Sequence, residues 1–154
     1  MSATSFDPNR TLHLVDLPNL IGGPLRGHRV PNVLQRFLQA SAFQPGDHLV
    51  VAADQRLART AVFEVPSGAR FLACTQTDAP HRLIDAVPAE LIARRYGRLV
   101  IGSGDHRLRN LAIEVRSLGI PVTVLAVPQS LSGSLRRSAD TYVPLGAFPG
   151  SEAA

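Results

Sequence analysis

The chain has 154 residues, 45% of them hydrophobic, and a formal net charge of +4 at pH 7. All sixteen basic residues are arginine, and the lack of lysine excludes the usual lysine-dependent phosphate loop, Schiff-base enzymes and phospho-receiver domains. The single cysteine excludes disulfide scaffolds and clustered-cysteine zinc sites. No apolar run approaches the ~20 residues of a membrane helix and the N-terminal sequence has no signal pattern, so we expect a cytoplasmic protein without a membrane partner.

The length predicts one domain over 11–146, with a flexible N-terminus at 1–10 and a flexible tail at 147–154. A buried strand is predicted over 11–17. The apolar face of a helix follows it, formed by Val30, Leu34, Phe37, Leu38 and Ala42. The second and third strands are predicted over 47–54 and 69–76, on either side of a short basic stretch.

The second half of the domain repeats the order of strand and helix. The segment 78–97 is helical in composition, and its Pro88 should begin a second helix or kink a single one. Strands are predicted over 98–104, 121–128 and 141–145, with an amphipathic helix between the first two. This alternation predicts an α/β fold whose mainly parallel sheet carries helices on both faces, joined by right-handed crossovers.

Two aspartates directly follow predicted strands, Asp16 after the first and Asp105 after the fourth. The functional crevice of such a sheet lies at the carboxyl ends of the strands, where the strand order reverses. If these strands are neighbours, both carboxylates project into that crevice, where their mutual repulsion calls for a cation. Carboxylate oxygens select Mg²⁺ or Mn²⁺, and such an ion allows hydrolysis of a phosphodiester bond.

Structural interpretations of the acidic residues stay open alongside this one. Asp105 could cap the following helix, although no helix signal follows Asp16 at once. Asp85 falls in the middle of a predicted helix, Asp78 could be a cap or a loop residue, and Asp140 could belong to a turn before the last strand. The five histidines lack the paired spacing of a zinc motif.

Three segments together resemble the NYN domain family, relatives of the PIN-domain nucleases: HLVDLPNL (13–20), VIGSGDHRL (100–108) and the closing stretch over 119–145. Asp16 and Asn19 match the family's strand-one pair, Ser103 and Asp105 its S-G-D motif, and Asp140 its late acidic position. The resemblance implies a three-layer Rossmann-like PIN/NYN fold with strand order 3-2-1-4-5, an optional extra edge strand, and Mg²⁺- or Mn²⁺-dependent ribonuclease activity.

The chain departs from the family pattern at two acidic positions. Arg107 stands where many members carry a second acidic residue, two positions after the aspartate of S-G-D. Pro80 occupies the register of another, which leaves Asp78 and Asp85 as substitutes. Because lost carboxylates weaken metal binding, a catalytically inactive RNA-binding or regulatory adaptor is the alternative to an enzyme. A small-molecule nucleotide-binding module is a third interpretation, supported by fold type alone.

The leading hypothesis is a metal-dependent endoribonuclease that cleaves single-stranded RNA. The predicted metal ligands are Asp16, Asp105, Asp85, Asp78 and Asp140, and the predicted catalytic set is Asp16, Asp105, Asp85, Asn19 and Ser103. Arginines on loops and helix starts are expected to guide the RNA backbone, namely Arg26, Arg29, Arg56, Arg107, Arg109, Arg136 and Arg137. The resemblance also leaves a homodimer open.

Overall fold

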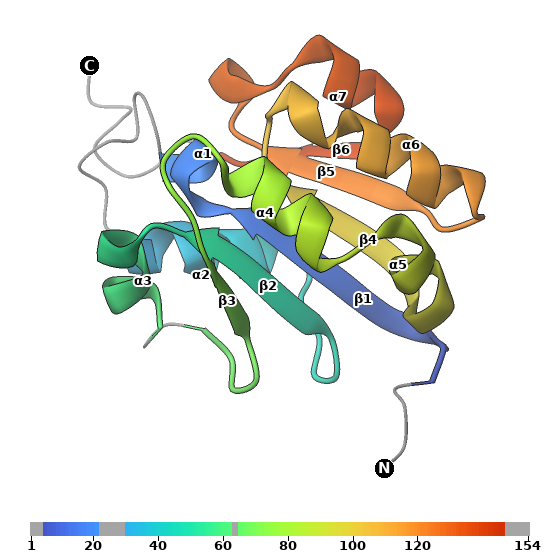
Figure 1. Cartoon of the computed structure of the whole chain (residues 1–154), viewed down its shortest axis with the longest axis horizontal. Coiled ribbons are helices and arrows are strands. Elements are labelled where there is room, and N and C mark those ends of the chain that lie inside the picture. The colour runs from blue at the N-terminus through green and yellow to red at the C-terminus, as the bar shows by residue number, and fades with distance from the viewer. Residues whose placement is uncertain (1–4, 22–29, 63–64, 147–154) are drawn as a thin grey trace.

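The structure is a computed structural model that describes residues 5–21, 30–62 and 65–146. A six-stranded sheet forms its centre, and every pair of neighbouring strands is parallel (Figure 1). The strand order is β3-β2-β1-β4-β5-β6, which is the predicted order 3-2-1-4-5 extended by an edge strand. The strands are β1 (Asp7–Asp16), β2 (His48–Ala53), β3 (Arg70–Ala73), β4 (Tyr96–Gly102), β5 (Val122–Ala126) and β6 (Thr141–Pro144).

Helices cover both faces of the sheet, so the predicted three-layer α/β fold is confirmed. In Figure 1 one layer of helices lies in front of the sheet, and α2 (Val30–Ala40) lies behind it. The front layer is α4 (Ala79–Ala86), α5 (Ala89–Arg95), α6 (Arg109–Ser117) and α7 (Gly133–Ser138). The other layer is α1 (Leu17–Ile21), α2 (Val30–Ala40) and α3 (Gln55–Ala61). Two 3-10 turns, η2 (His106–Leu108) and η3 (Pro128–Ser130), complete the elements of the described residues.

The core consists of two apolar clusters, one on each face of the sheet. Alternate residues of the central strand, β1, belong to the two clusters. Leu12 and Leu14 pack toward α4 to α7, and Val15 packs toward α1 and α2. Side chains point alternately to the two faces of a strand, and a parallel sheet covered on both faces needs apolar residues on both. The last six residues of β1 are accordingly all buried.

Several element boundaries differ from the predicted ones, and the structure decides between the two outcomes expected for Pro88. The first strand begins at Asp7 rather than at 11, so residues 7–10 belong to the sheet and not to a flexible terminus; Asp7 pairs with Tyr96 of β4. Helix α2 ends at Ala40, and Ala42 lies beyond it with a positive φ of 54°. Pro88 starts a second helix, because α4 ends at Ala86 and α5 begins at Ala89. The predicted tail over 147–154 lies outside the described residues.

Within the described ranges, every helix is too short or too polar to cross a bilayer. The carboxyl ends of the six parallel strands all lie at one edge of the sheet. We call this the carboxyl edge and the opposite one the amino edge.

Candidate functional site at the carboxyl edge of the sheet

Asp16 lies at the centre of the carboxyl edge, as the last residue of β1. The residue is 2% exposed, because β1 runs between β2 and β4 and helix α1 follows directly. Its Oδ1 accepts a 3.2 Å hydrogen bond from the backbone N–H of Asn19, which is the bond a helix-capping residue makes. The expectation that no helix follows Asp16 at once was therefore wrong, since Asp16 also caps α1.

Ser103 connects Asp16 to the loop that follows β4. Its hydroxyl donates a 2.9 Å hydrogen bond to Oδ2 of Asp16. The same hydroxyl oxygen accepts a 3.0 Å hydrogen bond from the backbone N–H of Asp105. Ser103 is fully buried, so it fixes the relative positions of the two aspartates without contacting solvent.

Asn19 ties the same loop to α1 from the other side. Its Oδ1 accepts a 2.9 Å hydrogen bond from the backbone N–H of Gly104. Gly104 is packed so closely against the backbone of Ser130 that a Cβ at this position would overlap the Ser130 carbonyl oxygen. The carbonyl of Gly104 also accepts a 2.8 Å hydrogen bond from Ser132. The S-G-D loop is thus held by α1 on one side and by the η3 segment on the other.

Asp105 is bound by Arg107 over both of its carboxylate oxygens. The guanidinium donates a 3.0 Å bond from Nε to Oδ1 and a 2.8 Å bond from Nη2 to Oδ2. The backbone N–H of Arg107 adds a 2.9 Å bond to Oδ1, which makes Asp105 the cap of η2. The capping role considered for Asp105 is thus confirmed. The remaining guanidinium nitrogen, Nη1, donates a 2.6 Å bond to the carbonyl of Thr77.

Asp16, Asp105 and Arg107 all line one open cavity of about 270 Å³. It lies where the strand order reverses between β1 and β4, which is the place expected for a ligand in an open α/β sheet. The other side chains in its wall come from α1, from the segment after β3, from α4 and from η3: Pro18, Asn19, Gln76, Pro80 and Ser130.

The two carboxyl groups of the cavity differ in their electrostatics. Burial, with a smaller contribution from the charge of Asp105, raises the pKa of Asp16 to about 6, while the hydrogen bonds from Ser103 and Asn19 and the charge of Arg107 act to lower it. Burial also acts to raise the pKa of Asp105, but the hydrogen bonds and charge of Arg107 outweigh it, so that pKa lies below its usual value. Asp16 has no ion-pair partner in the described part of the chain, whereas Asp105 pairs with Arg107 and its Oδ1 also lies 3.7 Å from Nδ1 of His106.

Two other predicted ligands, Asp78 and Asp85, do not line the cavity. Asp78 accepts a 2.6 Å hydrogen bond from the backbone N–H of Thr75 and lies 3.5 Å from Arg82; these interactions hold its pKa below the usual range. Asp85 is exposed on α4. Pro80, at the position where the family resemblance places an acidic residue, does line the cavity. At this position the cavity wall therefore has a proline ring in place of the expected carboxylate.

Asp140 lies at the amino edge, so its assignment to the site was wrong. Its Oδ2 accepts a 2.8 Å hydrogen bond from the backbone N–H of Val122, the first residue of β5. Its Oδ1 is 3.1 Å from Nε of Arg116. An aspartate that precedes a strand of a parallel sheet reaches the edge where strands begin, opposite the edge where Asp16 lies.

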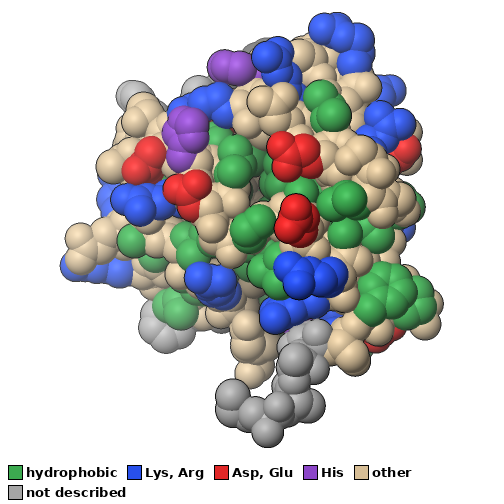
Figure 2. All heavy atoms as spheres, turned by 45° about the vertical axis from the view of Figure 1, so that its right-hand side comes forward, with side chains coloured by type: hydrophobic (Ala, Val, Ile, Leu, Met, Phe, Trp, Pro, Cys, Tyr) green, Lys and Arg blue, Asp and Glu red, His purple; other side chains and the backbone are tan. Residues whose placement is uncertain are grey.

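Among the described arginines that were predicted to contact RNA, Arg107 alone lines the cavity. The guanidinium of Arg136 lies over the ring of Tyr142, 5.2 Å from its centroid. Arg56, Arg109 and Arg137 are exposed on α3, α6 and α7, and Arg26 and Arg29 lie outside the described residues. On the face seen in Figure 2, arginines are scattered among carboxylates and apolar side chains and form no continuous patch.

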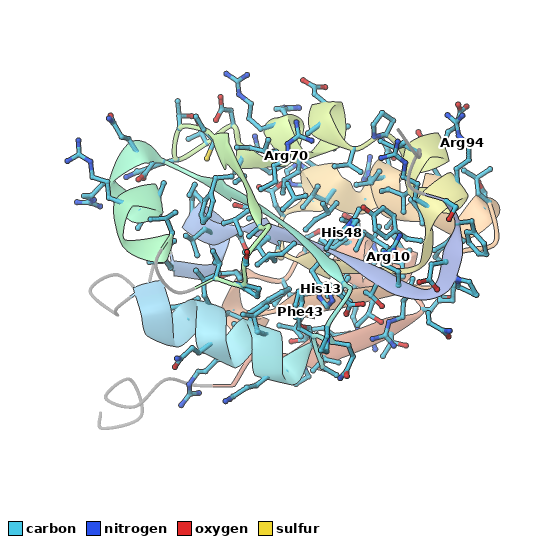
Figure 3. All side chains as sticks on the ribbon, turned by 90° about the horizontal axis from the view of Figure 1, so that it is seen from below. Arg10, His13, Phe43, His48, Arg70 and Arg94 are labelled. Atoms are coloured by element: carbon cyan, nitrogen blue, oxygen red, sulfur yellow. The ribbon has the colours of Figure 1, made fainter. Side chains whose placement is uncertain are left out.

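The amino edge holds a buried histidine with a structural role. Nε2 of His13 lies 3.1 Å from Oδ2 of Asp47, and its ring centroid is 4.9 Å from that of Phe43 (Figure 3). Burial lowers the pKa of His13, although the hydrogen bond and charge of Asp47 act to raise it. Throughout the described ranges, no group of three or more His, Cys, Asp or Glu side chains is arranged to hold a metal ion.

Two polar residues of the wall, Gln76 and Ser130, were not among the predicted site residues, and Gln76 is the one that carried a signal. It closes the stretch 69–76, so its position at the end of a predicted strand was an available signal. Ser130 and Pro18 offered no comparable signal, because their approach to the cavity depends on how the loops fold over the edge.

Comparisons with known proteins show the fold. No family model matches the sequence, and no curated protein matches it. Among solved structures, the chain is similar to a crystal structure of a protein of unknown function from Vibrio parahaemolyticus, with a TM-score of 0.66 and 19% sequence identity. The match covers 95% of this chain and 96% of that one. At this identity, the likeness extends to the α/β fold alone.

Proposed function

We propose that the protein is a cytoplasmic, metal-dependent endoribonuclease that cleaves single-stranded RNA at the carboxyl-edge cavity. The observation that carries the proposal is the state of Asp16. This carboxyl group is buried, borders an open cavity, and has no cationic partner in the described part of the chain. A buried charge is costly unless something neutralises it, and a divalent cation shared with Asp105 would do so.

The donor set fits Mg²⁺ or Mn²⁺. Magnesium commonly keeps several of its waters and takes one or two carboxylates from the protein together with phosphate oxygens of the substrate. Asp16 and Asp105 would supply those carboxylates. When bound, the ion lowers the pKa of a water nucleophile and stabilises the leaving oxygen of a phosphodiester.

Ser103 and Asn19 support this site as positioning residues. The hydroxyl of Ser103 is bonded to both Asp16 and the backbone of Asp105, and the amide oxygen of Asn19 is bonded to Gly104. Their polar groups thereby hold the two carboxylates at the mouth of the cavity. Arg107 is the cation that lines the cavity itself, and it would contact a phosphate of the RNA backbone.

A second candidate, an RNA-binding protein without catalysis, is favoured by the pairing of Asp105 with Arg107. That ion pair neutralises one of the two carboxylates, and Pro80 offers no third. Such a protein would bind RNA through phosphate contacts, so its affinity would fall with rising salt and would survive in EDTA.

Cleavage of a labelled, mixed-sequence single-stranded RNA separates the two candidates. The enzyme proposal expects cutting with Mn²⁺ or Mg²⁺, no cutting in EDTA, and loss of activity in both Asp16→Asn and Asp105→Asn. Asp85→Asn is the matched control, because it removes the same charge from an exposed position away from the cavity. Intact RNA in every metal, with salt-sensitive binding that persists in EDTA, would leave the binding protein.

A further inference from the structure

Arg107 occupies the oxygen atoms that a metal ion would need on Asp105. Two nitrogens of its guanidinium bind the two carboxylate oxygens at 3.0 and 2.8 Å, and its backbone N–H binds Oδ1 as well. The third nitrogen is bonded to the Thr77 carbonyl at 2.6 Å. A side chain with this many partners holds a defined position, and here that position satisfies the charge of Asp105 from within the protein.

A divalent ion therefore competes with Arg107 for Asp105. A carboxylate that accepts a bidentate guanidinium is a poorer metal ligand, since its charge is already neutralised and two positive groups would repel each other at short range. Asp16 has no such competitor in the described part of the chain. The cavity thus presents one carboxylate that is open to a metal and one that is occupied by a cation of the chain itself.

A phosphate diester is the chemical group that can exchange with Asp105 on Arg107. The planar guanidinium fork binds phosphate in the same bidentate way as it binds carboxylate. The Arg107 side chain is 33% exposed and lines the cavity, so a ligand can reach it without unfolding of the edge.

Resting on the proposed function, we infer that Arg107 is an exchangeable counter-ion that couples phosphate binding to metal binding. When a phosphodiester takes the guanidinium, Asp105 is freed and joins Asp16 as a ligand. Asp16 and Asp105 would then hold the ion together, and the bound phosphate and water would supply its other oxygen ligands. Because binding couplings are reciprocal, a phosphodiester strengthens metal binding and the metal strengthens phosphate binding by the same factor.

The test measures Mn²⁺ binding to the full chain, by following the electron paramagnetic resonance signal of free Mn²⁺. Arg107→Gln removes the competing charge and keeps a polar side chain, so we expect it to bind Mn²⁺ about tenfold more tightly than the unaltered protein. Arg109→Gln is the matched control. It removes the same charge two residues away from an exposed side chain, and its affinity should stay within about twofold.

Dimethyl phosphate serves as the probe for coupling. It should tighten Mn²⁺ binding by the unaltered protein and leave binding by Arg107→Gln unchanged. Arg107→Lys keeps a cation at this position, so it should bind Mn²⁺ as weakly as the unaltered protein, which guards against an effect of altered folding. Equal Mn²⁺ affinity in the unaltered protein and Arg107→Gln would overturn this inference and leave the nuclease proposal standing. If neither binds Mn²⁺, both proposals fail.

Discussion

Ser103 and Asp16 are 87 positions apart in the sequence and are joined by a 2.9 Å hydrogen bond inside the protein. The bond links the carboxyl ends of β4 and β1, the two strands between which the strand order reverses. One buried hydroxyl thus connects the motif after the first strand to the motif after the fourth.

Asp16→Asn should stabilise the metal-free protein. The pKa of Asp16 is about 6 in the folded state and 3.8 ordinarily, so the folded protein binds a proton more readily than the unfolded chain. Ionised Asp16 therefore lowers the free energy of unfolding by its full amount above about pH 6 and by nothing below pH 3.8. The difference between the two pKa values corresponds to about 3 kcal/mol. In EDTA at pH 7, we expect the free energy of unfolding to rise by about 1–3 kcal/mol, as measured by urea denaturation.

The same comparison at lower pH checks the origin of that gain. As the pH falls from 7 to 4, Asp16 becomes protonated and the advantage of Asp16→Asn should shrink toward zero. The titration of His13 affects both proteins equally and cancels in the difference. A gain that stays constant over this range would show that removal of the charge is not its cause.

Ser103→Ala should destabilise the protein and loosen the S-G-D loop. The substitution removes the donor to Asp16 and the acceptor for the Asp105 backbone, and an unpaired buried polar group costs about 1–3 kcal/mol. Thermal unfolding measures the loss. Ser117→Ala is a fitting comparison, because that exposed hydroxyl bonds only to the carbonyl of Glu114 within its own helix, and it should change stability by less than about 0.5 kcal/mol.

Gly104→Ala should disturb the site because a Cβ at this position overlaps the Ser130 carbonyl. Overpacking of this kind costs about 1–3 kcal/mol, and relief requires the η3 segment to move away from the cavity. Gly146→Ala provides the contrast, since a Cβ there meets no atom within 4 Å. Unfolding midpoints that fall equally in the two variants would contradict the close packing described for Gly104.

Asp140→Ala should weaken the fold and leave metal binding unchanged. Its carboxylate accepts the Val122 N–H at the start of β5 and pairs with Arg116, and the loss of a charged acceptor costs about 1–3 kcal/mol. We expect a lower unfolding midpoint with the Mn²⁺ affinity of the unaltered protein. A large loss of Mn²⁺ affinity without any change in stability would return Asp140 to the metal site.

The strand pattern predicted most of the fold because parallel strands buried on both faces must be apolar throughout. The order of neighbours followed from the family resemblance, and the structure agrees with it. The start of β1 could not be predicted, since residues 7–10 (DPNR) have no apolar pattern and are ordered by contacts with β4. Pro8 in that segment lies so close to Gly97 that only glycine fits beneath it.

The two central aspartates could be predicted because each directly follows a strand, and so lies at the carboxyl edge. The same reasoning assigns Asp140 to the other edge, because it precedes its strand, but the sequence analysis did not apply it. The pairing of Asp105 with Arg107 depends on side-chain conformation. The bond from Arg107 to Thr77 crosses 30 positions of the chain, and no local pattern indicates it.

Asp16 and Asp105 each cap a helix as well as lining the cavity. Helix capping is useful to the fold whether or not the protein acts on RNA, so replacement of either aspartate by a residue that cannot cap a helix would be selected against even in a lineage that had lost activity. Retention of both aspartates in a relative is therefore poor evidence of catalysis. The positions of Pro80 and Arg107 are more informative, because an acidic residue there would add charge to the cavity without serving either cap.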